Sequence, residues 1–303
     1  MKKLKILVTG GAGFIGSHVV DAYISAGHSV SVIDNLSTGN PANVHPKARF
    51  YKVDIRDSAG VAAVFSREKP EIVNHQAALA SVTLSLKRPL ETYEVNTLGT
   101  INLLLASAPY IKKFIFASSG GAIYGQPKKI PTTEQELPSP ISAYGFSKQL
   151  AEDAVRFYAG QLGFEYIILR PSNVFGPRQN NGGEGGIFAI FTALAATGSQ
   201  PTIYRKESTR DYVYVTDIAK ANLLATTKAK NETLHISSAR QTSNQQVYEI
   251  IAKEFDWQKK PIYQAARPGE IARSALSAVK AEKMLGWQPT VSIPQGVKNM
   301  KLY

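Results

Sequence analysis

A tyrosine and a lysine four residues apart, Tyr144 and Lys148, are the side chains of this sequence best suited to acid–base chemistry. Pro140 and Ser142 precede them, and Ser142 is suited to cap a helix that we expect to reach about Tyr158. On a helix, side chains at this spacing share one face, about 5–6 Å apart at Cβ. A nearby ammonium favours the phenolate, so we expect Lys148 to lower the pKa of Tyr144 and to let it act as a base. The same spacing also occurs on ordinary surface helices, so the elements that position the pair must decide its meaning.

A glycine-rich turn near the N-terminus predicts a dinucleotide site. An apolar strand over residues 5–9 runs directly into this turn, and apolar residues with helical spacing come after it. Glycines permit the tight turn and the close approach of a pyrophosphate, which binds to the free N–H groups of the next helix. The residues expected to contact the cofactor here are Gly10, Gly13, Phe14, Ile15 and Gly16.

The next strand, expected over residues 30–34, ends at Asp34. An acid in this position hydrogen-bonds the ribose hydroxyls and repels a 2′-phosphate, so the sequence predicts NAD rather than NADP. Asp54, just after a strand near residues 50–53, is expected to meet the adenine end.

Further strands near residues 72–75, 114–117 and 166–170 alternate with helices, one of them over residues 89–108. This alternation predicts an α/β fold with a doubly wound parallel sheet of the Rossmann type. Ligands of such sheets bind beyond the carboxyl ends of the strands. The residues expected to converge there are Thr9, Asp34, Ala77, Ser119 and Arg170.

Two regions are expected. Residues 1–172 form the NAD-binding domain, with its sheet completed by strands near 211–215 and 234–237. Residues 173–303, where the alternation loosens, form mainly a smaller mixed α/β cap for the substrate, interleaved with the first region.

The composition narrows the class of protein. The 303 residues include no cysteine, and the five histidines are scattered without metal-ligand spacing, so we expect no disulfide and no metal site. The net charge of +12 is dispersed, which favours a solubilising surface over a nucleic-acid partner. No apolar run approaches the ~20 residues of a membrane span, and the short apolar run after Met1 is read as a strand, so we expect a cytoplasmic protein without a membrane partner.

Several sequence runs extend across most of the chain: residues 9–16, 32–39, 75–78, 95–100, 118–125, 173–178, 209–215 and 267–270, together with Tyr144 and Lys148. These runs resemble the extended short-chain dehydrogenase/reductase family and, within it, the UDP-glucose (UDP-galactose) 4-epimerases.

The resemblance implies a reaction and its catalytic residues. NAD stays bound and takes a hydride from C4 of a nucleotide-diphosphate hexose, then returns it to the other face of the 4-ketose. UDP-glucose and UDP-galactose are the expected substrates, with UDP-GlcNAc and UDP-GalNAc as further candidates. Ser119, with Ser118 as the alternative, hydrogen-bonds the sugar hydroxyl; Tyr144 takes its proton and Lys148 holds the nicotinamide ribose.

The resemblance also implies two sets of binding residues. For the cofactor it adds Asn35, Ser37, Thr38, Gly39, Ile55, Gln76, Ala77, Ala78, Asn96, Ser118 and Pro171 to Asp34, Asp54 and the glycine turn, besides Tyr144 and Lys148. For the nucleotide sugar it implies Ser119, Gly120, Tyr144, Asn173, Arg178, Thr202, Tyr204, Arg210, Arg267, Glu270 and Ser274.

Ser274 falls where relatives specific for plain hexoses carry a tyrosine beside the C2 substituent. Because serine is far smaller, we expect room for an N-acetyl group. Arg273 or Leu276 refilling that space is the competing interpretation.

Two other functions fit parts of the sequence. The sister 4,6-dehydratases and decarboxylases need a carboxylate after the active-site hydroxyl, where this chain has Gly120, Gly121 and Ala122. A non-catalytic, nucleic-acid-associated relative fits the charge but not the retained Tyr144 and Lys148.

A homodimer is the expectation for the family, built from the helices near 89–108 and 144–158. These helices carry more apolar residues than one sheet face needs, and we expect them to pack against a second copy. The residues in question are Leu90, Tyr93, Leu103, Leu104, Val155 and Tyr158.

Overall fold

The computed structural model describes residues 2–180, 186–265 and 271–301. The strands of the central sheet are β1 (Lys5–Thr9), β2 (Ser29–Ile33), β3 (Arg49–Tyr51), β4 (Ile72–His75), β5 (Lys113–Ala117), β6 (Glu165–Pro171) and β11 (Glu232–Ile236). The helices of this part are α1 (Phe14–Ser25), α2 (Ser58–Glu68), α3 (Val82–Lys87), α4 (Pro89–Tyr93), a π-helical turn (Glu94–Leu98), α5 (Gly99–Ser107), α6 (Ala143–Leu162), α8 (Val215–Ala225) and α10 (Val279–Leu285), with a 3₁₀ turn at Pro41–Asn43.

The seven strands lie in the order β11-β6-β5-β4-β1-β2-β3, and every pair of neighbours is parallel. The chain moves outward from β1 to β2 and β3 on one side, and through β4, β5 and β6 on the other. The prediction of a doubly wound parallel sheet is therefore confirmed. The point where the direction reverses, between β1 and β4, is where such sheets bind ligands.

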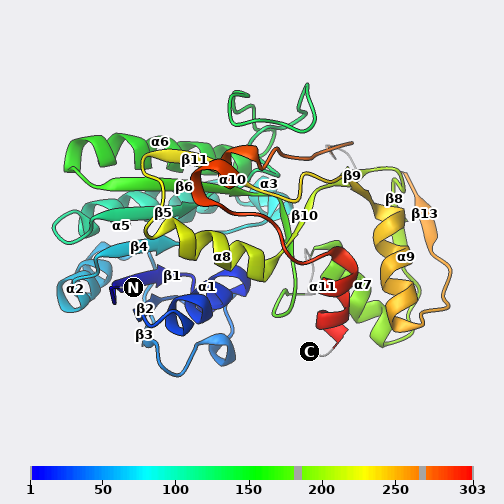
Figure 1. Ribbon diagram of the computed structural model, residues 1–303, viewed down its shortest axis with the longest axis horizontal. Coiled ribbons are helices and arrows are strands. Elements are labelled where there is room, and N and C mark those ends of the chain that lie inside the picture. Colours follow the sequence, from blue (N-terminus) through cyan, green and yellow to red (C-terminus); the bar gives the residue numbers. More distant parts are fainter. Residues whose placement is uncertain (1, 181–185, 266–270, 302–303) are drawn as a thin grey trace.

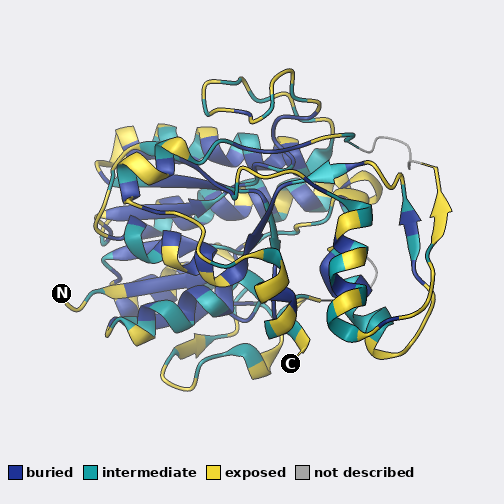
Figure 2. Ribbon diagram, turned by 45° about the vertical axis from the view of Figure 1, so that its right-hand side comes forward, coloured by how far each residue is buried: buried dark blue, intermediate teal, exposed yellow. Residues whose placement is uncertain are grey.

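Helices cover both faces of the sheet, which explains why its strands are apolar on both sides. On one face α1, α8 and α10 pack on residues such as Ile6 and Ile115, and Trp287 is buried with them. On the other face α2, α5 and α6 pack on residues such as Leu7 and Phe116. The sheet is accordingly buried between two helical layers whose outer positions are exposed (Figure 2).

The remaining elements gather at one end of the molecule, to the right in Figure 1, where α7, α9 and α11 lie with β8 and β13. They are β7 (Asn173–Phe175), α7 (Ile187–Ala196), β8 (Thr202–Tyr204), β9 (Thr209–Arg210), β10 (Tyr212–Tyr214), β12 (Thr242–Ser243), α9 (Asn244–Phe255), β13 (Ile262–Gln264) and α11 (Ile293–Lys301). A separate apolar core, with Phe175, Phe188 and Trp257 among its members, holds them together.

One of the two strands expected to complete the central sheet lies elsewhere. β11 joins the sheet beside β6, as expected for the strand near 234–237. β10, the strand expected near 211–215, pairs instead with β7 in a separate two-stranded sheet. β7 begins two residues after β6 ends, so β10 pairs with the continuation of the chain beyond β6 and not with β6 itself.

On the helices expected to pack against a second copy, the exposed apolar residues are not all the predicted ones. Leu103, Leu104 and Val155 are fully buried within this chain, in the core between α5, α6 and the sheet. Leu90, in contrast, is 75% exposed, and Phe157 on α6 is 60% exposed. Among the described residues, no helix has the length and apolar character needed to cross a membrane.

Candidate active site

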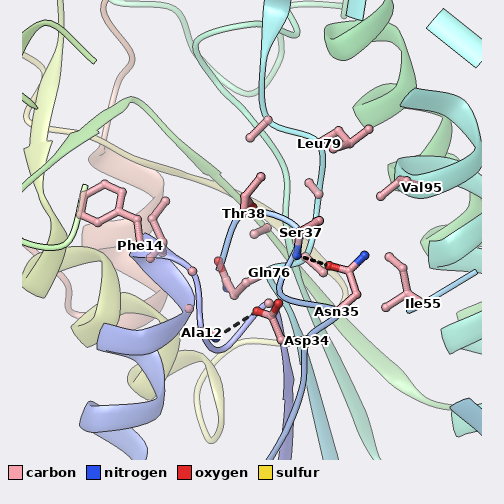
Figure 3. Close-up of a pocket in the computed structure, with 18 of the residues that line it drawn as sticks. Ala12, Phe14, Asp34, Asn35, Ser37, Thr38, Ile55, Gln76, Leu79 and Val95 are labelled. Atoms are coloured by element: carbon pink, nitrogen blue, oxygen red, sulfur yellow. Dashed lines mark hydrogen bonds between the residues drawn. The ribbon is translucent and has the colours of Figure 1, made fainter. Parts of the chain in front are cut away.

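A cavity of about 660 Å³ opens beyond the carboxyl ends of β1 and β4. Its volume lies within the range of small-molecule sites. The turn after β1 forms its floor, and the residues after β2, β4 and β5 form its walls (Figure 3). The sequence pattern predicts a ligand crevice at this point of the sheet, and the structure places a cavity there.

The glycine turn fits a bound pyrophosphate. Gly10 has a φ of +69°, and a Cβ there would lie 2.7 Å from the backbone N of Ala77. A Cβ on Gly16 would lie 2.0 Å from the carbonyl oxygen of Gly10, so α1 packs against the turn only without one. Gly13 is the N-cap of α1, and its lack of a side chain leaves the first N–H groups of the helix without a side-chain cap. An anion in the cavity would supply the missing acceptor.

Acidic side chains line the opposite wall. Asp34 is buried and accepts hydrogen bonds from the backbone N of Ala12 (3.0 Å) and of Leu36 (2.8 Å), which fixes its carboxylate at the cavity. Asp54 accepts from Asn35 Nδ2 (2.8 Å) and from Arg56, whose hydrogen bonds hold the pKa of this carboxyl well below its usual range. Asp34 is thus held by backbone groups, whereas Asp54 is held in place by a neighbouring cation.

Apolar side chains lie beside this acidic wall. Ile55, Leu79 and Val95 gather on one side of the cavity in Figure 3. They provide a surface suited to a flat aromatic base, next to the two carboxylates. The cavity is therefore suited to a dinucleotide.

Tyr144 and Lys148 line the far end of the same cavity, on the first turns of α6. Ser142 Oγ accepts a hydrogen bond from the backbone N of Gly145 (3.1 Å), which confirms the predicted cap. Lys148 is buried, and its Nζ donates to the carbonyl oxygen of Ala117 (2.7 Å) and lies 4.8 Å from the ring centroid of Phe116. Burial lowers the pKa of Lys148 to about 7, and the charge of Glu152 opposes this effect.

The pKa of Tyr144 differs from the expectation. Burial raises it, and a side-chain hydrogen bond with Ser119 opposes that effect in part. Lys148 does not produce the expected decrease, because its ammonium is turned to the backbone of β5. The Tyr144 phenol therefore holds its proton in this structure.

Ser118 and Ser119 have different surroundings, which bears on the choice between them. Ser118 Oγ donates to Glu152 Oε1 at 2.6 Å in a buried contact. Ser119 hydrogen-bonds the side chain of Tyr144. Ser118 also lines the cavity, but its hydroxyl proton is used by Glu152, so Ser119 is the serine placed beside the phenol.

Arg170 does not join the crevice, although β6 ends there. Its guanidinium donates to both carboxylate oxygens of Glu152 (2.7 and 2.6 Å) and to Tyr124 Oη (2.5 Å). Burial alone would raise the pKa of Glu152, but these hydrogen bonds outweigh it and lower the value. The expectation that Arg170 converges on the ligand is thus wrong; its neighbours Leu169 and Pro171 line the cavity instead.

His75 at the end of β4 is fully hydrogen-bonded inside the core. Thr100 Oγ1 donates to the carbonyl oxygen of Asn96 (2.6 Å), so His75 Nε2 donates to Thr100 Oγ1 (2.9 Å) and Nδ1 accepts from Thr9 Oγ1 (2.7 Å). Burial lowers the pKa of His75 well below its usual value. A neutral imidazole therefore braces β1 against β4 below the crevice, and this explains why Thr9 supports the cavity without lining it.

A second cavity of about 680 Å³ adjoins the first, with Ala80 and Gln179 lining both. Its walls come from β7, α7, β8 and β9, and include the predicted substrate residues Asn173, Thr202, Tyr204 and Arg210. Asn173 Nδ2 donates to the carbonyl oxygen of Asp211 (3.1 Å), which fixes it at the wall of the second cavity. The wall combines aromatic side chains and amides with aliphatic residues, a lining suited to a nucleoside.

Most of the predicted residues are brought together by these two cavities, and the others fall into separate groups. Asn96 lies behind the wall, where its side chain accepts from the backbone N of Leu79 (2.8 Å). Gly39, Ser119, Gly120 and Ser274 are outside both linings, although a Cβ on Gly39 would touch Asp34. Arg178 lines the first cavity instead of the second. Arg267 and Glu270 lie outside the described residues.

Several lining residues could not be found from the sequence. Asn222 and Ile218 on α8, and Ile236 at the end of β11, come from distant segments that carry no local signal. Asn222 Oδ1 accepts from Asn74 (2.8 Å) and from Gln76 (3.1 Å), so it also positions the Gln76 amide. The other lining residues without a prediction are Ala12, Ile33, Asn40, Asn43, Val53, Arg56, Leu79, Ala80, Glu91, Val95, Ala117, Leu169, Gln179 and Asn180 in the first cavity, and Val174, Gly186, Ile187, Phe188, Ile190, Phe191, Leu194, Gln200, Ile203, Tyr212 and Asn244 in the second.

Solved structures similar to this chain come from several organisms. UDP-glucose 4-epimerase from Thermotoga maritima, solved with UDP-glucose, is 44% identical, with a TM-score of 0.97 over 99% of this chain and 98% of that one. UDP-glucose 4-epimerase from Thermus thermophilus, solved with NAD, is 39% identical, with a TM-score of 0.92 over 98% and 97% of the two chains. UDP-N-acetylglucosamine 4-epimerase from Methanobrevibacter ruminantium, solved with UDP-N-acetylmuramic acid, is 32% identical, with a TM-score of 0.94 over 100% and 98%.

The model of one protein family matches residues 6–237, which include the glycine turn, Asp34, both serines, Tyr144 and Lys148. This match covers most of the chain, the whole lining of the first cavity and all of the second except Asn244, and the likeness to the Thermotoga maritima epimerase extends over 99% of the chain. The chain therefore belongs to the NAD-dependent epimerase/dehydratase family.

Proposed function

We propose that this protein inverts C4 of a UDP-hexose, interconverting UDP-glucose and UDP-galactose, with NAD as a resident cofactor. The observation that carries the proposal is the position of Tyr144. It lines the dinucleotide cavity, hydrogen-bonds Ser119, and lies on the helix that also presents Lys148. The adjoining second cavity is of a size suited to the nucleotide sugar.

Tyr144 and Ser119 would bind the C4 hydroxyl of the sugar. Ser119 would form a hydrogen bond with that hydroxyl. Tyr144 would remove the proton of the hydroxyl and later return it. Burial keeps the phenol protonated without a ligand, so proton removal needs an additional positive charge near Tyr144. NAD, when bound, supplies the hydride acceptor and donor at C4.

Lys148 would hold the nicotinamide ribose at the end of the first cavity. Its Nζ is buried and already donates to Ala117, and an ammonium has two further donors for ribose hydroxyls. Because Lys148 lies one turn after Tyr144 on α6, it fixes the nicotinamide end beside the phenol. Asp34 would bind the adenosine ribose at the opposite end.

The second cavity would hold the nucleoside diphosphate. Asn173, Thr202, Tyr204 and Arg210 line it, and arginine is suited to phosphate oxygens by the geometry of its guanidinium. Residues 173–303 supply most of this cavity, so we assign them mainly to substrate binding and residues 1–172 mainly to the cofactor.

Dehydration and decarboxylation are disfavoured by the residues after Ser119. Gly120 and Gly121 bring no acid, and a Cβ on Gly120 would lie 2.3 Å from Leu276. Glu152, the carboxylate that contacts Ser118, is paired with Arg170 and Arg156 and is fully buried. Its oxygens are therefore committed, and it cannot exchange protons with the sugar.

An N-acetylated hexose is a second candidate substrate, supported by the 32% identical relative named for UDP-N-acetylglucosamine. Ser274 is 8% exposed, and its backbone N donates to the carbonyl oxygen of Thr209 (3.1 Å) beside β9. Ser274 lines neither cavity, so this candidate rests on that relative and on the small serine side chain, which we expect to leave space beside the C2 substituent.

A homodimer is supported by two apolar stripes on neighbouring helices. Leu90 on α4, Leu98 at the end of the π-helical turn and Leu105 on α5 follow one another at eight and seven residues, and are 75, 55 and 50% exposed. Phe146 and Phe157 lie eleven residues apart on α6 and are 43 and 60% exposed. The intervals of seven and eleven residues return to one helix face, so these exposed side chains form the kind of surface that a second copy covers.

The decisive experiment is product analysis. Incubation of the purified protein with UDP-glucose should yield UDP-galactose, identified by the C4 configuration in the NMR spectrum, without net consumption of added NAD. Tyr144→Phe should lower kcat by roughly 10²–10⁴-fold, the loss typical of an acid–base group. A 4-keto-6-deoxy product would show the sister dehydratase reaction and overturn the proposal.

A further inference from the structure

Arg178 belongs to the cofactor cavity by position, although its sequence context suggests the substrate. It lines the first cavity, together with Gly13, Phe14 and Ile15 at the start of α1. It is absent from the lining of the second cavity, where Arg210 is found. Of the two diphosphates that the enzyme has to bind, the dinucleotide's is thus the one within reach of Arg178.

Three cations line the first cavity, and two of them have other tasks. Arg56 donates two hydrogen bonds to Asp54 at the adenine end (3.0 and 2.8 Å). Lys148 lies at the opposite end, on α6. Arg178 is the remaining cation of this lining, and its guanidinium is paired with Asp21 on α1, the helix that begins at the glycine turn. The uncapped N-terminus of that helix faces the same cavity, where a pyrophosphate would bind.

The loop that carries Arg178 is attached to α1 itself. Arg178 Nη1 lies 2.8 Å from Asp21 Oδ2, and His18 Nε2 contacts the carbonyl oxygen of Pro177 at 3.1 Å. His18 and Asp21 are on one face of α1, three residues apart. Gln179 Nε2 donates to the carbonyl oxygen of Val174 (3.1 Å), which fixes the other side of the loop. The guanidinium is therefore positioned by the helix whose N-terminus faces the cavity.

The guanidinium has donor capacity left for a ligand. Arg178 Nη1 is paired with Asp21 Oδ2 at 2.8 Å, and a guanidinium carries five N–H donors in all. A phosphate oxygen is a suitable acceptor for donors that Asp21 does not use.

We propose that Arg178 binds the pyrophosphate of the dinucleotide, and not the diphosphate of the sugar nucleotide, and that Asp21 positions it. This inference rests on the proposed function only in assuming two different diphosphate ligands. The loop after β7 then fastens the cofactor in its cavity. A firmly bound cofactor suits an enzyme that returns the hydride to the 4-ketose it has just formed, because such an enzyme has no need to release the cofactor.

The test compares the two ligands in full-length Arg178→Gln protein purified with its cofactor. NAD release after dilution is measured by chromatography of the free nucleotide, and UDP binding is measured by calorimetry. We expect release to become roughly 10- to 100-fold faster, the size expected for a lost charge-assisted hydrogen bond, while the Kd for UDP stays within about twofold of the parent. Arg178→Lys keeps the positive charge but loses the planar guanidinium. Its rate of NAD release should lie between those of the parent and of Arg178→Gln.

Arg67→Gln is the matched control, because Arg67 is exposed on α2 and lines neither cavity. It should leave NAD release unchanged, and thermal melting should show that all variants are folded. Unchanged NAD release in Arg178→Gln would overturn the proposal, and a tenfold weaker Kd for UDP would assign Arg178 to the substrate. Equal losses for both ligands would also overturn it, since they would indicate a collapsed loop. Neither measurement uses turnover, so the result stands whichever sugar reaction is catalysed.

Discussion

Ser118 donates its hydroxyl proton to Glu152 at 2.6 Å, and this one buried contact separates two adjacent serines that the sequence leaves equivalent. Glu152 is the end point of a network in which Arg170 and Arg156 also bind its carboxylate. Ser118 is thereby built into the support of the site, while Ser119 is left beside Tyr144.

The two serines should respond differently to replacement by alanine. Ser119→Ala should lower kcat by roughly 10²-fold or more with little change in stability, because it removes a hydrogen bond to the reacting hydroxyl. Ser118→Ala should lower the free energy of unfolding by about 1–3 kcal/mol, because Glu152 loses a buried donor. Steady-state kinetics and urea denaturation of both variants check this. Reversed phenotypes would make Ser118 the active-site hydroxyl.

Lys148 should make the stability of the cofactor-free protein depend on pH. Its pKa in the folded protein is lowered by burial to about 7, so between pH 7 and pH 10 the unfolded chain binds more protons than the folded one. The free energy of unfolding should therefore rise with pH across this window, by about 1.4 kcal/mol per pH unit at most. Denaturation curves at pH 7, 8 and 9 should show this slope for the parent and lose it in Lys148→Met. Parallel slopes for the two proteins would refute the lowered pKa.

Asp34 should determine the preference for NAD over NADP. Asp34→Ser removes the carboxylate that would bind the adenosine ribose and repel a 2′-phosphate. We expect roughly 10- to 100-fold weaker NAD binding, and a smaller difference between NAD and NADP, measured by calorimetry. Asp153→Ser on the exposed face of α6 is the control and should change neither affinity. A preference for NAD that survives in Asp34→Ser would assign discrimination to another residue.

The apolar stripes on α5 and α6 should hold two copies together. Phe157→Glu or Leu98→Glu places a charge in the proposed interface and should convert a dimer into monomers, as measured by sedimentation velocity. Leu137→Glu is the control, because it also replaces an exposed apolar residue by glutamate. Leu137 is 81% exposed and lies outside these helices, so its replacement should leave the assembly unchanged. Parent protein that sediments as a monomer at all concentrations would remove the basis of the proposal.

Ser274 should control access for N-acetylated sugars. Ser274→Tyr is expected to suppress turnover of UDP-GlcNAc more than that of UDP-glucose, because the ring would fill the space beside the C2 substituent. Ser274→Ala keeps that space and should change the preference by less than about tenfold, the value of one hydrogen bond. The ratio of kcat/KM for the two substrates measures the effect. Equal losses for both sugars in Ser274→Tyr would show that this position is not the gate.

The sequence by itself determined the local parts of this site. The glycine turn, Asp34 at a strand end, and Tyr144 and Lys148 one turn apart on a capped helix all depend on residues close together in the chain. Strand and helix alternation also determined the parallel sheet, since the crossover rules leave few arrangements.

Tertiary structure alone decided which neighbouring side chain faces the ligand. Arg170 is turned to Glu152, Ser118 is bonded to the same carboxylate, and Arg178 is held over the first cavity by Asp21. β10 pairs with β7, and Asn222 reaches the cavity from α8. In each case the partner is far away in the sequence. A buried charge or polar group takes the orientation in which a partner satisfies it, and that partner exists only once the chain is folded.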